Sequence, residues 1–204
     1  MHEPRASALL ALWNDVEPEV DALYNDWHAN EHVPERLTVP GMLWARRYAT
    51  RPGTPGPRYL TFYGLRSADV LASAPYLRLL AHPTPLSARM RPHLHNISRW
   101  VCELRALRGA FDAHLLFAFA CQTEADARRS FALAPAEASA GSLLAERIPD
   151  AAPLPWMKGS QARGIAGDWL AACAADTDPH AAQAGRLAYE QRPVNGGYNG
   201  PRRI

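Results

Sequence analysis

The sequence of 204 residues is poor in lysine and cysteine and has no long apolar run. An apolar stretch at residues 9–13 is too short for a membrane span or for the apolar centre of a secretory signal. Cys102, Cys121 and Cys173 lie far apart and form no C-x-x-C pair. This spacing is typical of reduced thiols and argues against a cysteine zinc site. We therefore predict a cytoplasmic protein without a membrane partner.

Charge is distributed unevenly along the chain, although the formal net charge is only +2. Residues 1–35 hold eight acids and one arginine, whereas residues 36–108 hold twelve arginines and two acids. Lys158 is the sole lysine. The arginines alternate with apolar residues and form no continuous basic stripe, so nucleic acid is not an expected partner. The basic middle should instead pack beside the acidic first helix or serve an anionic small ligand.

The most informative pattern lies in the first expected helix, where His28 and His32 stand on either side of Glu31. Apolar residues recur at helical spacing before them, and Glu31 falls back onto that apolar face. A carboxylate on a buried face is costly unless it is paired or used. Pro34 should end or kink the helix one turn after His32. At such a helix end the dipole would favour a protonated histidine.

Residues 1–108 predict the element order β-α-β-β-α-β, which is the ferredoxin-like unit. Its expected strands are 6–16, 42–50, 58–66 and 96–106, and its expected helices are 17–33, 67–80 and 86–94. Residues 109–204 predict a weaker repeat. Its expected strands are 113–121, 141–148 and 168–175, its expected helices are 123–139 and 179–189, and a loose tail covers 193–204. The fold class is therefore α+β, with two ferredoxin-like units in tandem, of which the first carries the site and the second is degenerate.

Several motifs in residues 6–105 together resemble those of a known superfamily. They are Trp27-His28-x-x-Glu31-His32-x-Pro34-Glu35-Arg36-Leu37, Val39-Pro40-Gly41, Ala45-Arg46-Arg47-Tyr48, Pro57-Arg58-Tyr59-Leu60 with Tyr63, Ser73-x-x-Tyr76 and Pro83-Thr84-Pro85. With these motifs the first half resembles the dimeric α/β-barrel superfamily, near its EthD-like members. The resemblance implies two units that pair their sheets into a barrel, either in a homodimer or within one chain. It also implies a small-ligand pocket between a sheet and its helices.

Members of that superfamily include cofactor-free monooxygenases, isomerases, polyketide cyclases and decarboxylases, and some haem enzymes. We accordingly expect an enzyme that uses no metal or organic cofactor and performs acid–base chemistry on a small aromatic, lactone or polyketide-like substrate. His32 and His28 would be the acid and base. Glu31 would orient an imidazole and raise its pKa.

Candidate substrate contacts come mainly from the expected strands. They are Arg46, Tyr48, Tyr63, Trp27, Trp44 and His82. Alternation places Trp44, Arg46 and Tyr48 on one strand face. An arginine there could hold a carboxylate or enolate, and a tyrosine could donate to a developing oxyanion.

Two alternatives stay open at the level of sequence. The first is a non-catalytic ligand-binding or assembly module in which the histidines only connect helix to sheet. The second is a zinc or haem enzyme that uses His28 and His32, since His28-x-x-Glu31-His32 matches the H-x-x-E-H zinc motif. Pro34 and the lack of a clear third ligand downstream disfavour zinc.

Overall fold

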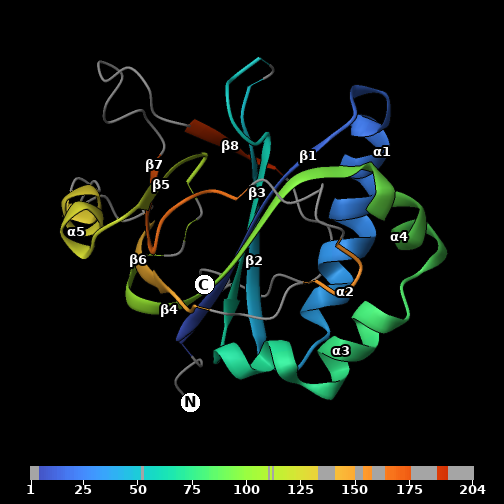
Figure 1. The fold of residues 1–204 in the computed structure, drawn as a ribbon, viewed down its shortest axis with the longest axis horizontal. Coiled ribbons are helices and arrows are strands. Elements are labelled where there is room, and N and C mark those ends of the chain that lie inside the picture. The colour runs from blue at the N-terminus through green and yellow to red at the C-terminus, as the bar shows by residue number, and fades with distance from the viewer. Residues whose placement is uncertain are drawn as a thin grey trace, which may run out of the picture.

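Both halves of the chain contribute strands to a single barrel in the computed structural model (Figure 1). The structure describes residues 5–51, 53–109, 111, 113–132, 141–149, 154–157, 164–175 and 188–192. Its strands are β1 (Ala8–Val16), β2 (Met42–Ala49), β3 (Tyr59–Leu65), β4 (Leu94–Arg108), β5 (Leu115–Cys121), β6 (Gly141–Arg147), β7 (Trp169–Ala175) and β8 (Ala188–Arg192). Its α-helices are α1 (Asp21–Trp27), α2 (Val33–Leu37), α3 (Ala74–Ala81), α4 (Pro85–Met90) and α5 (Glu124–Ala132). Short helical turns are η1 (Pro18–Val20), η2 (His28–His32), η3 (Ala68–Ala72) and η4 (Arg91–His93).

The barrel is closed, and its strand order is β1-β3-β2-β8-β5-β7-β6-β4. Each half has the same internal order, β4-β1-β3-β2 in the first and β8-β5-β7-β6 in the second. The halves meet at two antiparallel seams, where β2 pairs with β8 and β4 pairs with β6. The predicted tandem ferredoxin-like architecture is confirmed, and the barrel forms within one chain.

The barrel interior is filled by apolar side chains from both halves. Leu9, Trp13 and Trp100 from the first half pack with Leu143 and Leu170 from the second. The Trp13 and Trp100 rings meet edge to face, with centroids 5.4 Å apart. Because these residues form one shared core, neither half buries its inner face without the other.

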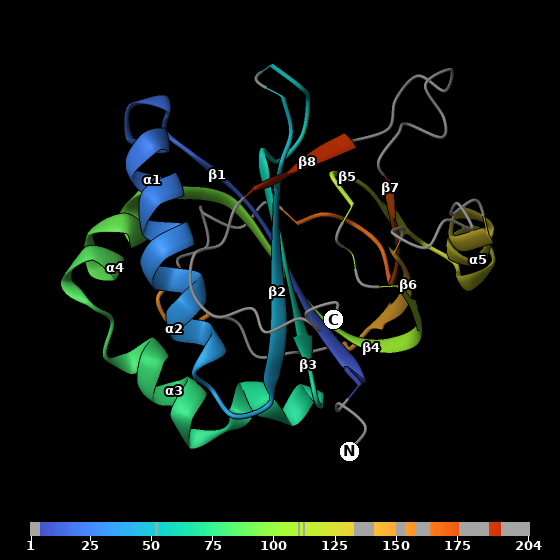
Figure 2. The ribbon, with the colours of Figure 1, turned by 180° about the vertical axis from the view of Figure 1, so that it is seen from behind.

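Helices α1 to α4 gather on one side of the first-half strands, and α5 lies at the opposite end of the molecule (Figures 1 and 2). Strand β1 is therefore buried on both faces, with Leu9 in the barrel and Leu10 against the helices. This explains its continuous apolar sequence. None of the described helices has the length and apolar character needed to cross a bilayer.

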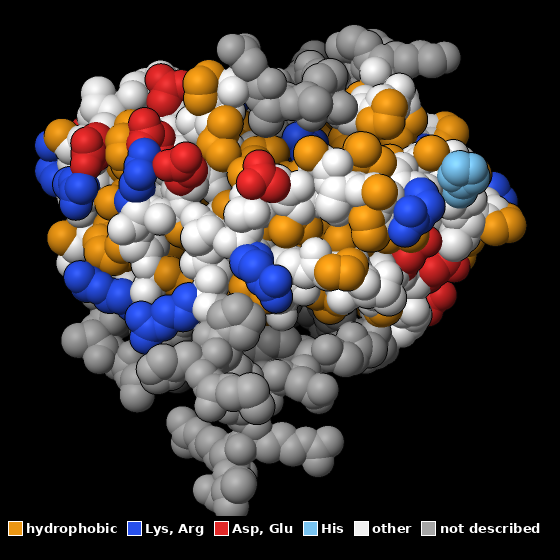
Figure 3. Space-filling view, turned by 90° about the horizontal axis from the view of Figure 1, so that it is seen from below, with side chains coloured by type: hydrophobic (Ala, Val, Ile, Leu, Met, Phe, Trp, Pro, Cys, Tyr) orange, Lys and Arg blue, Asp and Glu red, His pale blue; other side chains and the backbone are white. Residues whose placement is uncertain are grey.

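The acidic start of the first helix packs against basic residues, as the charge distribution predicted. Arg58 on the β2–β3 side pairs with Asp21 at 3.0 Å. The Glu17 carboxylate lies 3.1 Å from Nδ1 of His93 and 2.6 Å from Nε2 of His95. On the face seen from below, acidic and basic side chains are interspersed with apolar ones (Figure 3).

The first helix differs from its prediction, because it does not end near Val33. It continues through the π-helical turn η2 into α2 and ends at Leu37. The Val33 N–H donates to the carbonyl of His28, five residues back, so the turn is one residue wider than an α-helical turn. Pro34 then lies in the first turn of α2, where a missing N–H costs little.

Two expectations for the second half concern its helices. The predicted helix 123–139 is helical over α5, and residues 133–140 lie outside the described residues. The predicted helix 179–189 is wrong at its end, because residues 188–189 belong to strand β8. The remainder of that segment, and the tail 193–204, also lie outside the described part.

Candidate active site

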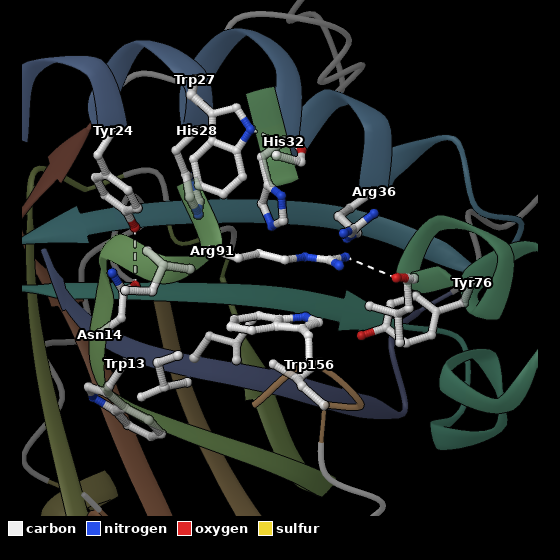
Figure 4. Close-up of a pocket in the computed structure, with 16 residues that line it drawn as sticks. Trp13, Asn14, Tyr24, Trp27, His28, His32, Arg36, Tyr76, Arg91 and Trp156 are labelled. Carbon is white, nitrogen blue, oxygen red and sulfur yellow. Dashed lines mark hydrogen bonds between the residues drawn. The ribbon is translucent and has the colours of Figure 1, made fainter. Parts of the chain in front are cut away.

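A cavity of about 70 Å³ lies beneath the first helix, between it, strand β1 and helices α3 and α4 (Figure 4). Apolar side chains from the sheet and α3 form part of its wall. The polar and aromatic lining consists of Trp13, Asn14, Tyr24, Trp27, His28, His32, Arg36, Tyr76, Ser87, Arg91 and Trp156. The structure thus brings both predicted histidines and Trp27 to one cavity.

The two histidines are the first and last residues of the π-turn η2 and lie side by side. Their ring centroids are 5.0 Å apart. The His32 ring packs on Trp27 at 4.5 Å, and the His28 ring packs on Tyr24 at 5.2 Å. His28 is only 5% exposed. The Nδ1 atoms of both rings are buried, and no hydrogen-bond partner for them exists among the described residues.

Both imidazoles are held in the neutral form. Burial lowers the pKa of each ring well below its ordinary value, because the charged form loses its hydration. Nearby guanidinium groups of Arg36 and Arg47 lower both pKa values further, and Arg91 adds to the effect at His32. The expectation of a protonated histidine is therefore wrong, because the helix does not end there and cations surround the pair.

Glu31 does not orient either imidazole, contrary to the prediction. Its carboxylate accepts hydrogen bonds from the hydroxyls of Thr84 and Ser87, the latter at 3.3 Å. Thr84 in turn caps helix α4 by accepting from the Ser87 N–H at 3.0 Å. The indole N–H of Trp27 donates to the Ser87 hydroxyl at 3.1 Å. Glu31 thus connects the first helix to α4 and positions the Trp27 wall of the cavity.

Two guanidinium groups also face the cavity, Arg36 from the same helix as the histidines and Arg91 from η4, and neither was assigned a role from the sequence. Arg36 is buried, and its Nη1 lies 3.1 Å from Glu35. Arg91 donates to the carbonyl of Leu80 at 3.0 Å, and its guanidinium lies 5.3 Å from the centre of the Trp156 ring. In Figure 4 the Arg91 side chain extends between the histidines above and Trp156 below.

The charges of these arginines shape the electrostatics of the cavity. Burial lowers the pKa of Arg91, and the neighbouring Arg36 lowers it further. Partial burial raises the pKa of the Glu35 carboxyl. The described lining itself contains no carboxylate. The cavity therefore combines two neutral bases with two guanidinium groups, of which Arg36 is paired with Glu35, and this arrangement favours an anion at Arg91.

Trp44, Arg46 and Tyr48 lie in the barrel interior and not at the cavity, contrary to the prediction. Arg46 Nε and the Tyr48 hydroxyl both donate to the carbonyl of Phe111, at 3.0 and 3.3 Å. Trp44 stacks on the Phe111 ring and covers Gly64, where any side chain would collide with the indole.

A β-bulge explains why these three side chains point into the barrel and not toward the helices. The register of β2 against β3 shifts between Met42 and Trp44. Beyond a bulge the alternation of faces is reversed. Ala45 and Ala49 therefore pack toward the helices, and Arg47 donates to Asn25 on α1 at 3.1 Å.

The last two predicted substrate residues also lie away from the cavity. Tyr63 packs beneath the helices, and burial raises the pKa of its hydroxyl. His82 is exposed at the end of α3. Of the six predicted contacts, Trp27 is the one that lines the cavity.

The H-x-x-E-H residues do not converge as a metal site would require, because Glu31 turns toward α4. Throughout the part of the chain that the structure describes, no three His, Cys, Asp or Glu side chains are grouped so as to hold a metal ion.

Comparison with known proteins identifies the fold. No protein-family model matches the sequence, and no curated protein matches it. An anthrone oxidase-like protein superposes with a TM-score of 0.54 and 12% identity, over 93% of this chain and 92% of that one. A provisionally assigned monooxygenase from Fusobacterium nucleatum subsp. nucleatum gives 0.52 and 10%, over 95% and 97%. A provisionally assigned chlorite dismutase gives 0.50 and 11%, over 90% and 93%.

The chain therefore shares the ferredoxin-like barrel fold of these three structures. The superfamily that the motifs resemble, and the narrower EthD-like assignment, stay predictions.

Proposed function

We propose that the chain is an enzyme that removes a proton from a small acidic molecule bound in the cavity, with His32 or His28 as the base. The observation that carries this proposal is the pair of neutral imidazoles, both of which line the cavity. A neutral imidazole can accept a proton, whereas an imidazolium cannot. Among the described residues that line the cavity, no other group combines these properties.

The lowered pKa of the bases limits the choice of substrate. A base of low pKa is a weak one, so it deprotonates only a substrate whose anion is stabilised in the site. Arg36 and Arg91 supply that stabilisation, and their charges act more strongly in a partly buried, mainly apolar cavity than in water. The substrate should therefore carry an acidified C–H or O–H, as in a phenol, an anthrone-like ketone or an unsaturated lactone.

Two outcomes are chemically balanced after deprotonation. Return of the proton to another carbon of the delocalised anion gives isomerisation or cyclisation without a co-reactant. Alternatively, the carbanion transfers electrons to dioxygen, so that a CH₂ group becomes C=O while dioxygen is reduced and one water is released. The names of two structural neighbours, an anthrone oxidase-like protein and a monooxygenase, favour the second outcome.

The experiment is turnover of a panel of anthrones, naphthols and unsaturated lactones, followed by absorbance and with an oxygen electrode. We expect His32→Ala and His28→Ala each to lower kcat by about 10²–10⁴-fold on the substrate that turns over. Oxygen consumption distinguishes oxygenation from isomerisation. His82→Ala is the matched control, because His82 is exposed, and it should keep wild-type activity.

Full activity in both cavity variants would rule out the proposed bases. The alternative, a non-catalytic binding module, predicts a different result. In that case the panel shows binding without turnover, and His32→Ala changes only stability, by about 1–3 kcal/mol.

A further inference from the structure

A larger groove adjoins the cavity on the side of helix α3. It has a volume of about 600 Å³ and lies between η3, α3 and strand β4. Its wall is mainly apolar and includes Ala72, Leu77, Ala81 and Val101. Leu77 is 49% exposed, and it is the one large hydrophobic residue classed as exposed among the described residues. The groove therefore presents open apolar surface that a ligand could cover.

The groove and the cavity share one wall. Tyr76, Leu80, Leu154 and Trp156 line both spaces. Because Trp156 and Tyr76 border both spaces, a change of rotamer at either residue would connect the two volumes.

The volumes of the cavity and the groove indicate that a ligand occupies both. The inner cavity, at about 70 Å³, holds a few waters and is smaller than the roughly 300–1,000 Å³ of small-molecule sites. The groove alone falls within that range. A substrate whose reacting atom reaches the histidines would therefore place most of its body in the groove.

The positions of the charged side chains indicate which end of the ligand lies in the inner cavity. The guanidinium of Arg91 is fixed at the shared wall by the Leu80 carbonyl, at 3.0 Å, and by the Trp156 ring. Arg36 lies on the inner side with the neutral histidines. The groove wall adds one acid, Asp69, and one base, Arg99, to a mainly apolar lining. The positive end of the combined space is thus the inner one.

Resting on the proposed function, we infer that the ligand is an organic anion with an extended apolar body. Its ionised oxygen lies at Arg91 and Arg36, and its body passes Trp156 into the groove. This assigns Ala72, Leu77 and Ala81 to substrate selection, although they lie outside the cavity that holds the histidines.

The test measures equilibrium binding of three probes by calorimetry: benzoate, anthracene-2-carboxylate and the neutral anthracene-2-carboxamide. Anthracene-2-carboxylate should bind at least tenfold more tightly than either of the others. Ala72→Trp and Ala81→Trp fill the groove from exposed positions, so both should fold normally. Each should weaken anthracene-2-carboxylate at least tenfold and leave benzoate unchanged.

Two further variants complete the design. Ala88→Trp adds the same bulk at an exposed position on α4 that lines neither space, and it should alter no affinity. Arg91→Gln should weaken both carboxylates at least tenfold and leave the carboxamide unchanged. Melting temperatures verify that each variant is folded.

Three results would overturn the inference: unchanged affinity in both groove variants, equal binding of carboxylate and carboxamide, or no binding of either carboxylate at millimolar concentration. Because no turnover is measured, these results are separate from the fate of the proposed function. The expected binding pattern combined with full activity of the histidine variants would refute the catalytic role and leave the ligand class in place.

Discussion

His28 and His32 link the chemistry of the site to the stability of the fold. In the folded chain, burial and neighbouring cations lower the pKa of both rings, whereas in the unfolded chain each returns to about 6.5. Between these values the unfolded state binds more protons than the folded state. Lowering the pH below about 6.5 therefore reduces the free energy of unfolding.

His32→Phe should remove part of this pH dependence while keeping an aromatic ring against Trp27. From pH 6.5 downward, we expect the free energy of unfolding of the wild type to fall more steeply than that of the variant, by up to roughly 1.4 kcal/mol per pH unit. Urea unfolding at several pH values measures both slopes. His82→Phe, at an exposed position, should retain the wild-type slope. Parallel slopes for His32→Phe and wild type would show that His32 carries a proton in the folded state.

The π-turn η2 is the element that reconciles Pro34 with a continuous helix. Since the turn is one residue wider, Pro34 begins a new α-helical segment and does not interrupt an old one. The same turn sets the 5.0 Å spacing of the two histidine rings. The stability of the first helix and the spacing of the two histidines therefore both depend on the additional residue that the π-turn accommodates.

Deletion of the exposed Asn30 should convert this turn to a regular α-helix and place Pro34 in its interior. We expect a loss of about 3 kcal/mol in the free energy of unfolding. Pro34→Ala alone should change it by less than about 1 kcal/mol. Adding Pro34→Ala to the deletion should recover most of the loss but not the ligand affinity, because the histidines stay displaced. Chemical denaturation and calorimetry measure the two effects, and a deletion variant as stable as wild type would contradict the account.

The whole molecule depends on two seams between its halves. Strand β2 pairs with β8, the fourth strand of the other half, and β4 pairs with β6, the second strand of the other half. A fragment of residues 1–108 would leave both β2 and β4 as open edges above an exposed apolar interior.

Two copies of that fragment offer each other the missing partners, because β2 of one copy can pair with β4 of the next. We expect the fragment to form a folded dimer in light scattering after size exclusion, with the full chain as the reference at equal concentration. A folded monomer, or a fragment that stays unfolded at every concentration, would contradict the equivalence of the halves.

The element order and the tandem barrel could be predicted from sequence, because strand alternation and the turn residues are local signals. Histidine placement was predictable for the same reason, since residues four apart share a helix face. Which face of β2 points toward the helices could not be predicted. The bulge between Met42 and Trp44 has no marker in the sequence, and it exchanges the faces on which Arg46 and Arg47 lie.

Other parts of the site depend on distant contacts. Arg91 and Trp156 are 65 positions apart and meet only in the folded chain, so neither motif nor periodicity pointed to them. Glu31 was expected on the inner face beside the histidines, whereas it is half-buried and its partners Thr84 and Ser87 lie at the start of α4 and within it. Long-range pairing of this kind decides which polar residues become a site.

Joining both halves in one polypeptide has an evolutionary consequence. When identical subunits build such a barrel, every substitution appears twice, and a change that helps one copy burdens its twin. Covalent duplication removes this constraint. One half is then free to diverge into a scaffold that closes the sheet, while the other carries the proposed site, which agrees with His28, His32, Arg36 and Arg91 all lining one cavity under the first-half helices.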